Sequence, residues 1–216
     1  MNDDLLFALD ESAELRALEV EKCRRSPWYW LCNWAWTMDS HDTKNPKKHF
    51  PALDYQQRFT DIWMQESVLL VPKSRQMMIT WVVVALYLHD AQFKTGRLIF
   101  FQSKKEGDAA DLVNRAWFIY ENQPCWMRPA AQKSYCKIEF TGNSSSIRGI
   151  PQGGDQIRMH TASGIFMDEA GFMPEAEAAF TASKPSIDGG GKITMVSSAN
   201  PGFFEMLVYD RMEMAI

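Results

Sequence analysis

The sequence lacks three features that would assign it to a class of protein at once. It has no apolar run near the roughly 20 residues that a membrane span needs, and its first residues are acidic where a secretory signal is basic. Its four cysteines are scattered and form no C-x-x-C pair, which excludes a zinc knuckle or a disulfide framework. These absences predict a soluble, intracellular protein that makes no contact with a membrane.

An excess of positive charge is also missing. A net charge of -4 argues against a protein that coats nucleic acid by bulk electrostatics. Two short basic patches could still contact DNA locally. One consists of Lys44, Lys47 and Lys48, and the other of Lys104 and Lys105. The alternative for both patches is ordinary solvated surface.

The 216 residues, 46% of them hydrophobic, can bury one sizeable core. We divide the chain into an N-terminal helical and aromatic segment, residues 1–49, and a main domain, residues 50–216. Leucines among acidic residues predict an amphipathic helix from Asp3 to about Arg25, which Pro27 stops. The aromatic residues that follow are expected either to pack as a core under a helix or to stack on bases: Trp28, Tyr29, Trp30, Trp34 and Trp36.

Two strand–loop–helix units begin in the main domain, after a helix expected to run from the segment 50–57 to Gln65. The first has an apolar strand at 68–72, a polar loop and a helix at about 78–93. The second has a strand at 97–101 and a helix at about 109–121. Consecutive units of this kind predict an α/β fold with a mainly parallel sheet flanked by helices.

The remainder of the chain is richer in strands. We expect a strand at 137–140, a turn at 142–146 and a short strand at 156–160. Two apolar runs follow, 164–167 and 192–196, and each ends in polar residues. Because sites in open α/β sheets lie outside the carboxyl ends of the strands, the ends of four strands are expected to meet in one crevice.

The loop between the first strand and its helix has the chemistry of a phosphate site but few of its usual residues. Phosphate binding calls for backbone N–H groups and a cation, and Thr80 is placed to reach a magnesium ion. The pattern G-x-x-x-x-G-K-[ST] matches only at Thr80, with Lys73, Met78 and Ile79 at its other defined positions. A lysine at the start of a folded loop can still bring its ammonium to the phosphates, with Arg75 as a second cation. The alternative is a basic turn without glycine, the residue that adopts positive φ most easily.

The acid pair Asp168-Glu169 ends an apolar strand. Such a pair fits a metal-bound carboxylate followed by a general base, although acidic pairs also end strands for no catalytic reason. The order along the chain favours the catalytic interpretation, since a phosphate-type loop, an acid pair and a strand ending in hydroxyl and amide groups follow one another.

These motifs resemble those of the large terminase subunits of tailed bacteriophages, over roughly 50–202. The resemblance implies a P-loop NTPase core of the ASCE type that binds ATP and Mg²⁺. It implies that Gln56 reads the adenine edge while Tyr55 packs the base, that Asp168 binds magnesium with Thr80, and that Glu169 is the catalytic base. The loop that takes the place of the Walker A motif consists of Lys73, Ser74, Arg75, Gln76, Met77, Met78, Ile79 and Thr80. The group that would sense the γ-phosphate consists of Ser197, Ser198 and Asn200.

The same family places an arginine finger shortly before the acid pair. Arg158 stands there, so the resemblance implies that it reaches the ATP of a neighbouring subunit in a ring. Arg148 is the competing candidate, and a surface arginine paired with an acid is the alternative for both.

The resemblance implies a motor that moves double-stranded DNA into a procapsid. Its expected partners are the portal protein, the small terminase subunit and further copies of itself in a homo-oligomeric ring, in the host cytoplasm. The alternatives are a helicase-like nucleic-acid-dependent ATPase and a degenerate module that no longer hydrolyses nucleotide. The RNase H-like nuclease domain of the family has no counterpart, and the chain ends at Ile216 in an expected helix, which predicts a fragment truncated at its C-terminus.

Overall fold

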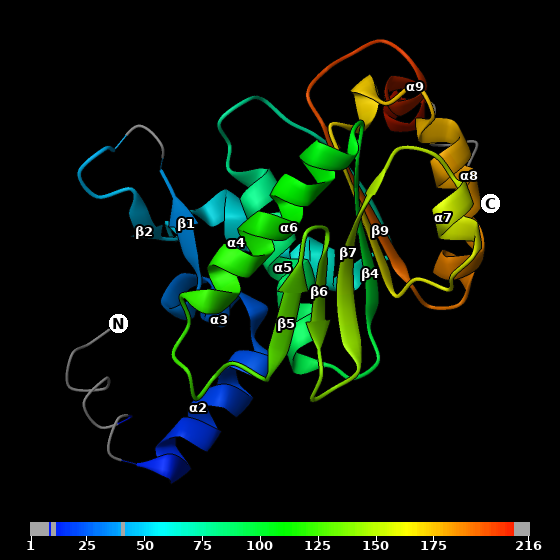
Figure 1. Ribbon diagram of the computed structural model, residues 1–216. Coiled ribbons are helices and arrows are strands. Elements are labelled where there is room, and N and C mark those ends of the chain that lie inside the picture. Colours follow the sequence, from blue (N-terminus) through cyan, green and yellow to red (C-terminus); the bar gives the residue numbers. More distant parts are fainter. Residues whose placement is uncertain (1–8, 10–11, 40–41, 210–216) are drawn as a thin grey trace.

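A mixed sheet of seven strands lies at the centre of the computed structural model, which describes residues 9, 12–39 and 42–209 (Figure 1). Five neighbouring strands run parallel, and two antiparallel strands extend the sheet at one edge. In spatial order the strands are β3 (Val68–Pro72), β9 (Lys192–Ser197), β8 (Gly164–Asp168), β4 (Leu98–Ser103), β7 (Ser145–Pro151), β6 (Lys137–Phe140) and β5 (Ala131–Ser134). The predicted α/β class with a mainly parallel sheet is confirmed.

Successive residues of the central strands face opposite sides of the sheet. Phe101 of β4 and Phe166 of β8 belong to one hydrophobic cluster, whereas Phe100 and Ile165 belong to a second. The first cluster packs under α4 (Asp54–Gln65), α5 (Ile79–Phe93) and α6 (Glu106–Glu121), and the second under α7 (Asp155–Arg158), α8 (Ala176–Asp188) and α9 (Phe203–Tyr209). Helices therefore cover both faces, and the carboxyl ends of the parallel strands stay open at one edge (Figure 1).

Among the described residues before α4 there are two helices and a short hairpin. They are α2 (Ala13–Arg25), α3 (Pro27–Trp34), β1 (Trp36–Met38) and β2 (Lys47–His49). Trp30 and Trp34 are buried, and Trp30 makes an edge contact with His89 of α5. For these two tryptophans the packed-core interpretation is confirmed. Residues of α3 and α5 belong to one hydrophobic cluster. The domain boundary proposed between residues 49 and 50 stays a prediction.

Leu9, before α2, is buried as predicted, but within α2 the buried side differs from the predicted leucine side. Leu15 and Leu18 are 40% and 67% exposed, whereas Glu19 and Cys23 are buried. Glu19 tolerates burial because its Oε1 accepts a hydrogen bond from the indole N–H of Trp34 at 2.8 Å. The expected start of this helix at Asp3 lies outside the described residues.

Two further local predictions were wrong. Residues 156–160 were expected as a strand, but 156–158 belong to helix α7. Ile157 is the one buried side chain among these five residues, so they have no alternating apolar pattern that could pair in a sheet. The expected turn at 142–146 ends at Ser144, because Ser145 already belongs to β7. Its hydroxyl accepts a hydrogen bond from Arg97 N and donates one to Lys94 O, which anchors the start of that strand.

None of the helices in the described part of the chain is both long and apolar enough to span a bilayer.

Candidate active site

The parallel pairing of β3, β9 and β8 brings three polar strand ends side by side. Pro72 pairs with Ser197 across β3 and β9, and Asp168 pairs with Val196 across β8 and β9. The backbone N–H of Lys73 donates to Ser197 O at 2.9 Å, so the loop after β3 begins against the end of β9. This register builds the crevice that the polar strand ends predict.

Four side chains that the sequence singles out meet in this crevice. The Lys73 ammonium lies 2.9 Å from Glu169 Oε1, and the Lys73 side chain is only 10% exposed. The Thr80 hydroxyl donates to Asp168 Oδ1 at 3.0 Å. The lysine at the start of the loop and the threonine at its end thus reach the same acid pair, as their predicted joint role requires.

The phosphate loop, residues 73–80, keeps a glycine-like backbone without glycine. Gln76 and Met78 have φ of 66° and 56°, in the left-handed region. For residues with a side chain this region costs roughly 1–2 kcal/mol each. Met78 is also the N-cap of α5 and makes no side-chain capping bond, so the first N–H groups of α5 are open to an anion.

The other side chains of the loop divide between core and solvent. Ile79, at the usual lysine position, is buried, and Met77 packs against the main hydrophobic cluster. Ser74 and Arg75 are exposed. The loop therefore presents Lys73 and Arg75 as its cations, as the sequence predicts.

Helix α4 is joined to the phosphate loop by a hydrogen bond from Tyr55. The Tyr55 hydroxyl donates to Met77 O at 2.9 Å, and Gln56 Nε2 donates to the Tyr55 hydroxyl at 3.5 Å. Gln56 is fully buried, and its Oε1 has no partner within the described structure. Gln56 thus lies beneath the loop and is linked to it through Tyr55, and its role as the residue that reads adenine stays a prediction.

The surroundings of the two acids shift their pKa values in opposite directions. Burial raises the pKa of Asp168, against the lowering effect of the Thr80 hydrogen bond. Burial also raises the pKa of Glu169, but the Lys73 ammonium and the Ser198 N–H and hydroxyl outweigh it and lower its pKa overall. Glu169 has φ of 53°, so the backbone turns sharply there and separates the two carboxylates. Glu169 is therefore held ionised, which suits a general base.

The end of β9 fastens the turn that carries Glu169. Ser198 donates to Glu169 Oε2 from its backbone N–H at 3.3 Å and from its hydroxyl at 3.1 Å. Gly171 N donates to Ser197 Oγ at 3.0 Å, and Asn200 Nδ2 donates to Gly171 O at 2.6 Å. The three residues predicted to sense γ-phosphate thus hold the acid turn, residues 168–172, in place.

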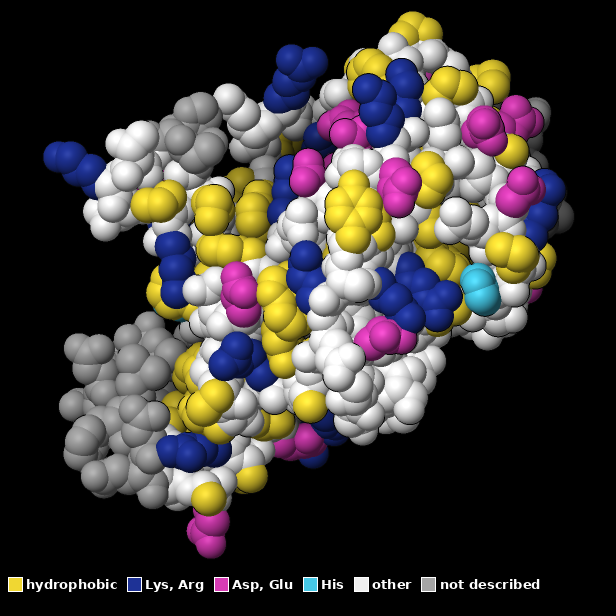
Figure 2. All heavy atoms as spheres, in the orientation of Figure 1, with side chains coloured by type: hydrophobic (Ala, Val, Ile, Leu, Met, Phe, Trp, Pro, Cys, Tyr) yellow, Lys and Arg dark blue, Asp and Glu magenta, His cyan; other side chains and the backbone are white. Residues whose placement is uncertain are grey.

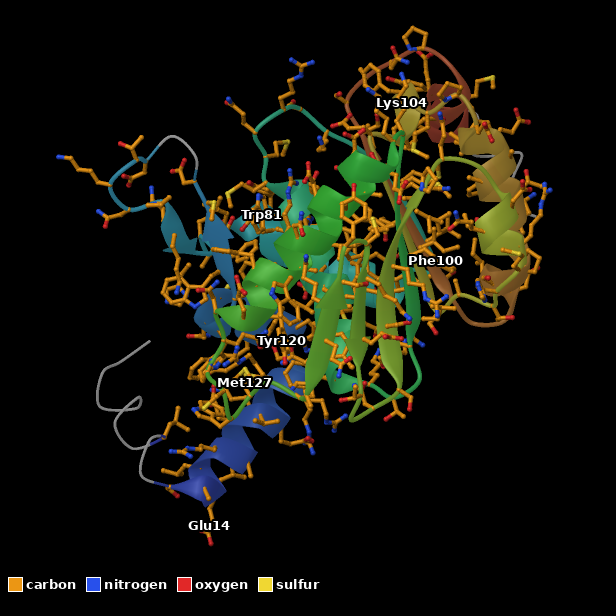
Figure 3. The ribbon with its side chains drawn as sticks, viewed as in Figure 1. Glu14, Trp81, Phe100, Lys104, Tyr120 and Met127 are labelled. Atoms are coloured by element: carbon orange, nitrogen blue, oxygen red, sulfur yellow. The ribbon has the colours of Figure 1, made fainter. Side chains whose placement is uncertain are left out.

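A cleft of about 440 Å³, here called the acid cleft, opens beside the acid pair. It is lined by the phosphate loop, the end of β4, one face of α6 and the acid turn: Arg75, Ser103, Lys104, Asp108, Asp111, Leu112, Arg115, Asp168, Glu169, Phe172 and Ser198. Figure 3 labels Lys104 at this edge of the sheet. The sequence interpretation missed the charged residues of α6. Their spacing of three and four residues, which places Asp108, Asp111 and Arg115 on one helix face, is the signal that points to them.

Neither candidate arginine finger lines the acid cleft. Arg158 is exposed on α7, lies 3.7 Å from Asp155, and faces a separate cleft with Met159 and His160. Arg148 lies within β7, opposite Phe100 and Lys137, and its Nε is buried without a partner among the described residues. The assignment of the finger stays a prediction.

The residues that can hold a magnesium ion are Thr80 and Asp168. A hydroxyl and a carboxylate are the hard oxygen ligands that Mg²⁺ takes, usually one or two from the protein with the rest from phosphates and water. Within residues 9, 12–39 and 42–209, no group of three His, Cys, Asp or Glu side chains forms a metal cage. The donor set therefore fits a metal that arrives with a nucleotide.

No protein-family model matches the sequence, but solved structures do. The chain is similar to the ATPase domain of the Thermus phage P74-26 large terminase, with a TM-score of 0.56 and 14% identity over 64% of this chain and 62% of that one. It is similar to the HK97 bacteriophage large terminase, with a TM-score of 0.68 and 10% identity over 89% of this chain and 41% of that one. The chain has the fold of a phage large terminase ATPase domain. This is a P-loop NTPase fold, as predicted.

A third terminase structure contains a nucleotide. The large terminase of a thermophilic bacteriophage in complex with ADP matches with a TM-score of 0.52 and 14% identity, over 67% of this chain and 38% of that one. This chain spans less than two thirds of each of these three terminase chains. In the terminase fold as this chain has it, the phosphate loop follows β3, the acid pair ends β8, and β9 lies between the two strands.

Proposed function

We propose that this chain is the ATP-hydrolysing motor domain of a terminase large subunit, which couples hydrolysis to the movement of double-stranded DNA into a procapsid. The observation that carries the proposal is the meeting of Lys73, Thr80, Asp168 and Glu169 at the carboxyl ends of β3 and β8. The fold, which it shares with terminase ATPase domains, supports it.

Each side chain then has a defined task. Lys73, Arg75 and the open N-terminus of α5 hold the phosphates, and Thr80 with Asp168 holds a magnesium ion, which neutralises phosphate charge. A triphosphate offers Lys73 more negative charge than one carboxylate does, so nucleotide binding draws the ammonium away from Glu169. Glu169 stays fixed by Ser198 and takes a proton from the attacking water.

The partners and location follow from the same proposal. The motor acts on double-stranded DNA with the portal protein and the small terminase subunit, as a homo-oligomeric ring in the host cytoplasm. Arg158 is exposed and lines a cleft other than the acid cleft, which suits a finger that reaches the nucleotide of a neighbouring copy.

The test is ATP turnover by purified protein, with magnesium, in two variants. Glu169→Gln removes the base and is expected to lower turnover roughly 100-fold or more while ATP still binds. Lys73→Ala removes the main phosphate cation and is expected to lower both binding and turnover. The matched controls are Glu177→Gln and Lys133→Ala, both at exposed positions outside the site. Turnover at the normal rate in both site variants would refute the proposal.

A nucleotide-binding module without hydrolysis is the second candidate. It is favoured by the buried Ile79 at the usual lysine position and by the left-handed non-glycine residues of the loop. Calorimetry with ATP and magnesium separates the possibilities. Heat of binding without turnover identifies a binding module, and no heat at millimolar nucleotide excludes both candidates.

A further inference from the structure

Arg115 of α6 adds a cation to the acid cleft from outside the phosphate loop. It lines the cleft together with Asp168 and Glu169. Asp108 and Asp111 of the same helix also line it, because a spacing of three or four residues places all three on one helix face. Burial raises the pKa of Asp168, and the charge of Arg115 is among the influences that lower it. The guanidinium is therefore close enough for its charge to act on the acid pair.

An aromatic ring holds the guanidinium of Arg115 in place. The guanidinium lies 5.4 Å from the centroid of the Trp81 ring of α5, and that ring makes an edge contact with Phe118 at 6.0 Å. Helices α5 and α6 pack against each other, and Figure 3 labels Trp81 beside α6. A guanidinium over a ring face keeps the N–H groups at its own edge available for another partner.

The donors of Arg115 lack an acceptor in the part of the chain that the structure describes. A guanidinium carries five N–H donors, yet Arg115 makes no hydrogen bond or ion pair with another described residue. Asp111 stands four residues earlier, the usual spacing of a helical ion pair, and this pair does not form. Lys73, by contrast, is already paired with Glu169. Arg115 thus has donors to offer to an anion that enters the cleft.

The charges around Arg115 suit a small anion better than a long one. Asp108 and Asp111 are exposed, so solvent screens their charge, whereas Arg115 is partly buried. Arg75 and Lys104 supply two further cations to the same cleft. Figure 2 shows acidic and basic side chains mixed along α6, without the continuous basic surface that a polyanion needs. A single phosphate group in the cleft fits this pattern.

We propose that Arg115 contacts the terminal phosphate group of the bound nucleoside triphosphate, an inference that rests on the proposed function and adds a residue to it. Arg75 of the phosphate loop, the base Glu169 and Arg115 line one cleft, so all three surround a phosphate group that lies there. A planar guanidinium binds two phosphate oxygens at once. Its charge stabilises the negative charge on the phosphoryl oxygens during transfer.

This contact differs from the one predicted for Arg158. Arg115 belongs to the same chain as the phosphate loop, so its contact needs no neighbouring copy. It also depends on the length of the phosphate chain, because a nucleoside diphosphate lacks the group that Arg115 binds. Arg115 therefore favours the triphosphate over the diphosphate.

The experiment measures two affinities by calorimetry, one for a non-hydrolysable ATP analogue and one for ADP, each with magnesium, together with the rate of ATP turnover. Arg115→Gln removes the charge. It is expected to weaken binding of the analogue roughly tenfold or more and to leave ADP binding within about twofold of wild type. Turnover at saturating ATP is expected to fall roughly 100-fold. Arg115→Lys keeps a charge without the planar fork and is expected to give intermediate values.

Arg128→Gln is the matched control. Arg128 is also partly buried and lies over an aromatic ring, 5.7 Å from the centroid of Tyr120, but it does not line the acid cleft. This variant removes a similar ring contact and is expected to change neither the ratio of the two affinities nor the turnover.

The outcomes distinguish the inference from the proposed function. If the wild-type protein binds both nucleotides and Arg115→Gln keeps the wild-type ratio of the two affinities, Arg115 does not contact the terminal phosphate group. The inference is then overturned while the proposed function stands. If the wild-type protein binds neither nucleotide, the proposed function fails and the inference fails with it.

Discussion

The phosphate loop and the acid turn face each other across the crevice. Both contain residues other than glycine whose backbone φ lies in the left-handed region. They differ in how that conformation is secured. The acid turn is bonded to Lys73, to both groups of Ser198, to Ser197 and to Asn200. The backbone of the phosphate loop makes a hydrogen bond at each end of the loop. Near the start, Lys73 N donates to Ser197 O of β9, and near the end, Met77 O accepts from the Tyr55 hydroxyl.

The difference separates two ways of building a site. The strained backbone at Glu169 is held by several bonds from its surroundings, so under the proposed function the base would be in position before the nucleotide binds. At Gln76 and Met78 the strained backbone has less support, and under the proposed function bound phosphate would supply part of what holds it. We therefore expect changes in the acid turn to affect stability and rate, and changes in the loop to affect affinity.

The largest effect is expected where the acid turn has no room. A Cβ added at Gly171 would lie 2.8 Å from Ser197 Oγ, which already accepts from Gly171 N and donates to Ser198 O. Gly171→Ala is expected to reduce the free energy of unfolding by about 1–3 kcal/mol, measured by denaturant titration. The control is Gly142→Ala, where a Cβ meets no atom within 4 Å. Equal stability of the two variants would contradict the tight packing of the turn.

A smaller effect is expected when one bond to the base is removed. Ser198→Ala takes away the hydroxyl that donates to Glu169 Oε2. We expect turnover to fall about tenfold, the value of one hydrogen bond to a charged group. Because that bond lowers the pKa of Glu169, its loss raises the pKa, and the acidic limb of the rate–pH profile moves to higher pH. An unshifted limb would show that Ser198 does not tune the base.

The smallest effect is expected from relieving strain in the loop. Met78→Gly gives the left-handed position its preferred residue and is expected to tighten ATP binding by up to about fivefold, from roughly 1 kcal/mol of relieved strain. Ser74→Gly is the matched control, since Ser74 has no positive φ and glycine there only adds flexibility. Calorimetry measures both, and weaker binding by Met78→Gly would show that the Met78 side chain itself contacts the nucleotide.

Much of the fold was predictable because its elements carry strong local signals. The strands at 68–72, 164–167 and 192–196 are short apolar runs followed by polar residues, and all three were found where predicted. Thr80 in the first turn of α5 was predictable from the change of a polar loop to an apolar helix. The segment 156–160 was mistaken because a single buried side chain specifies neither a strand nor a helix.

The parts of the site that escaped prediction depend on residues distant in the sequence. Arg115 reaches the acid cleft only because α6 packs beside the end of β4. The burial of Gln56 is of the same kind, because it follows from the packing of α4 under the phosphate loop.

The sequence by itself determined the alternation of strands and helices and the residue types at each strand end, because hydrophobic periodicity and local backbone preferences act over a few neighbouring residues. The tertiary structure decided which side chains meet. Pairing β9 between β3 and β8 set the distance from Lys73 to Glu169, and packing across the sheet supplied the contacts that hold left-handed residues without glycine. Such contacts join residues far apart along the chain, so they exist only once the sheet has formed.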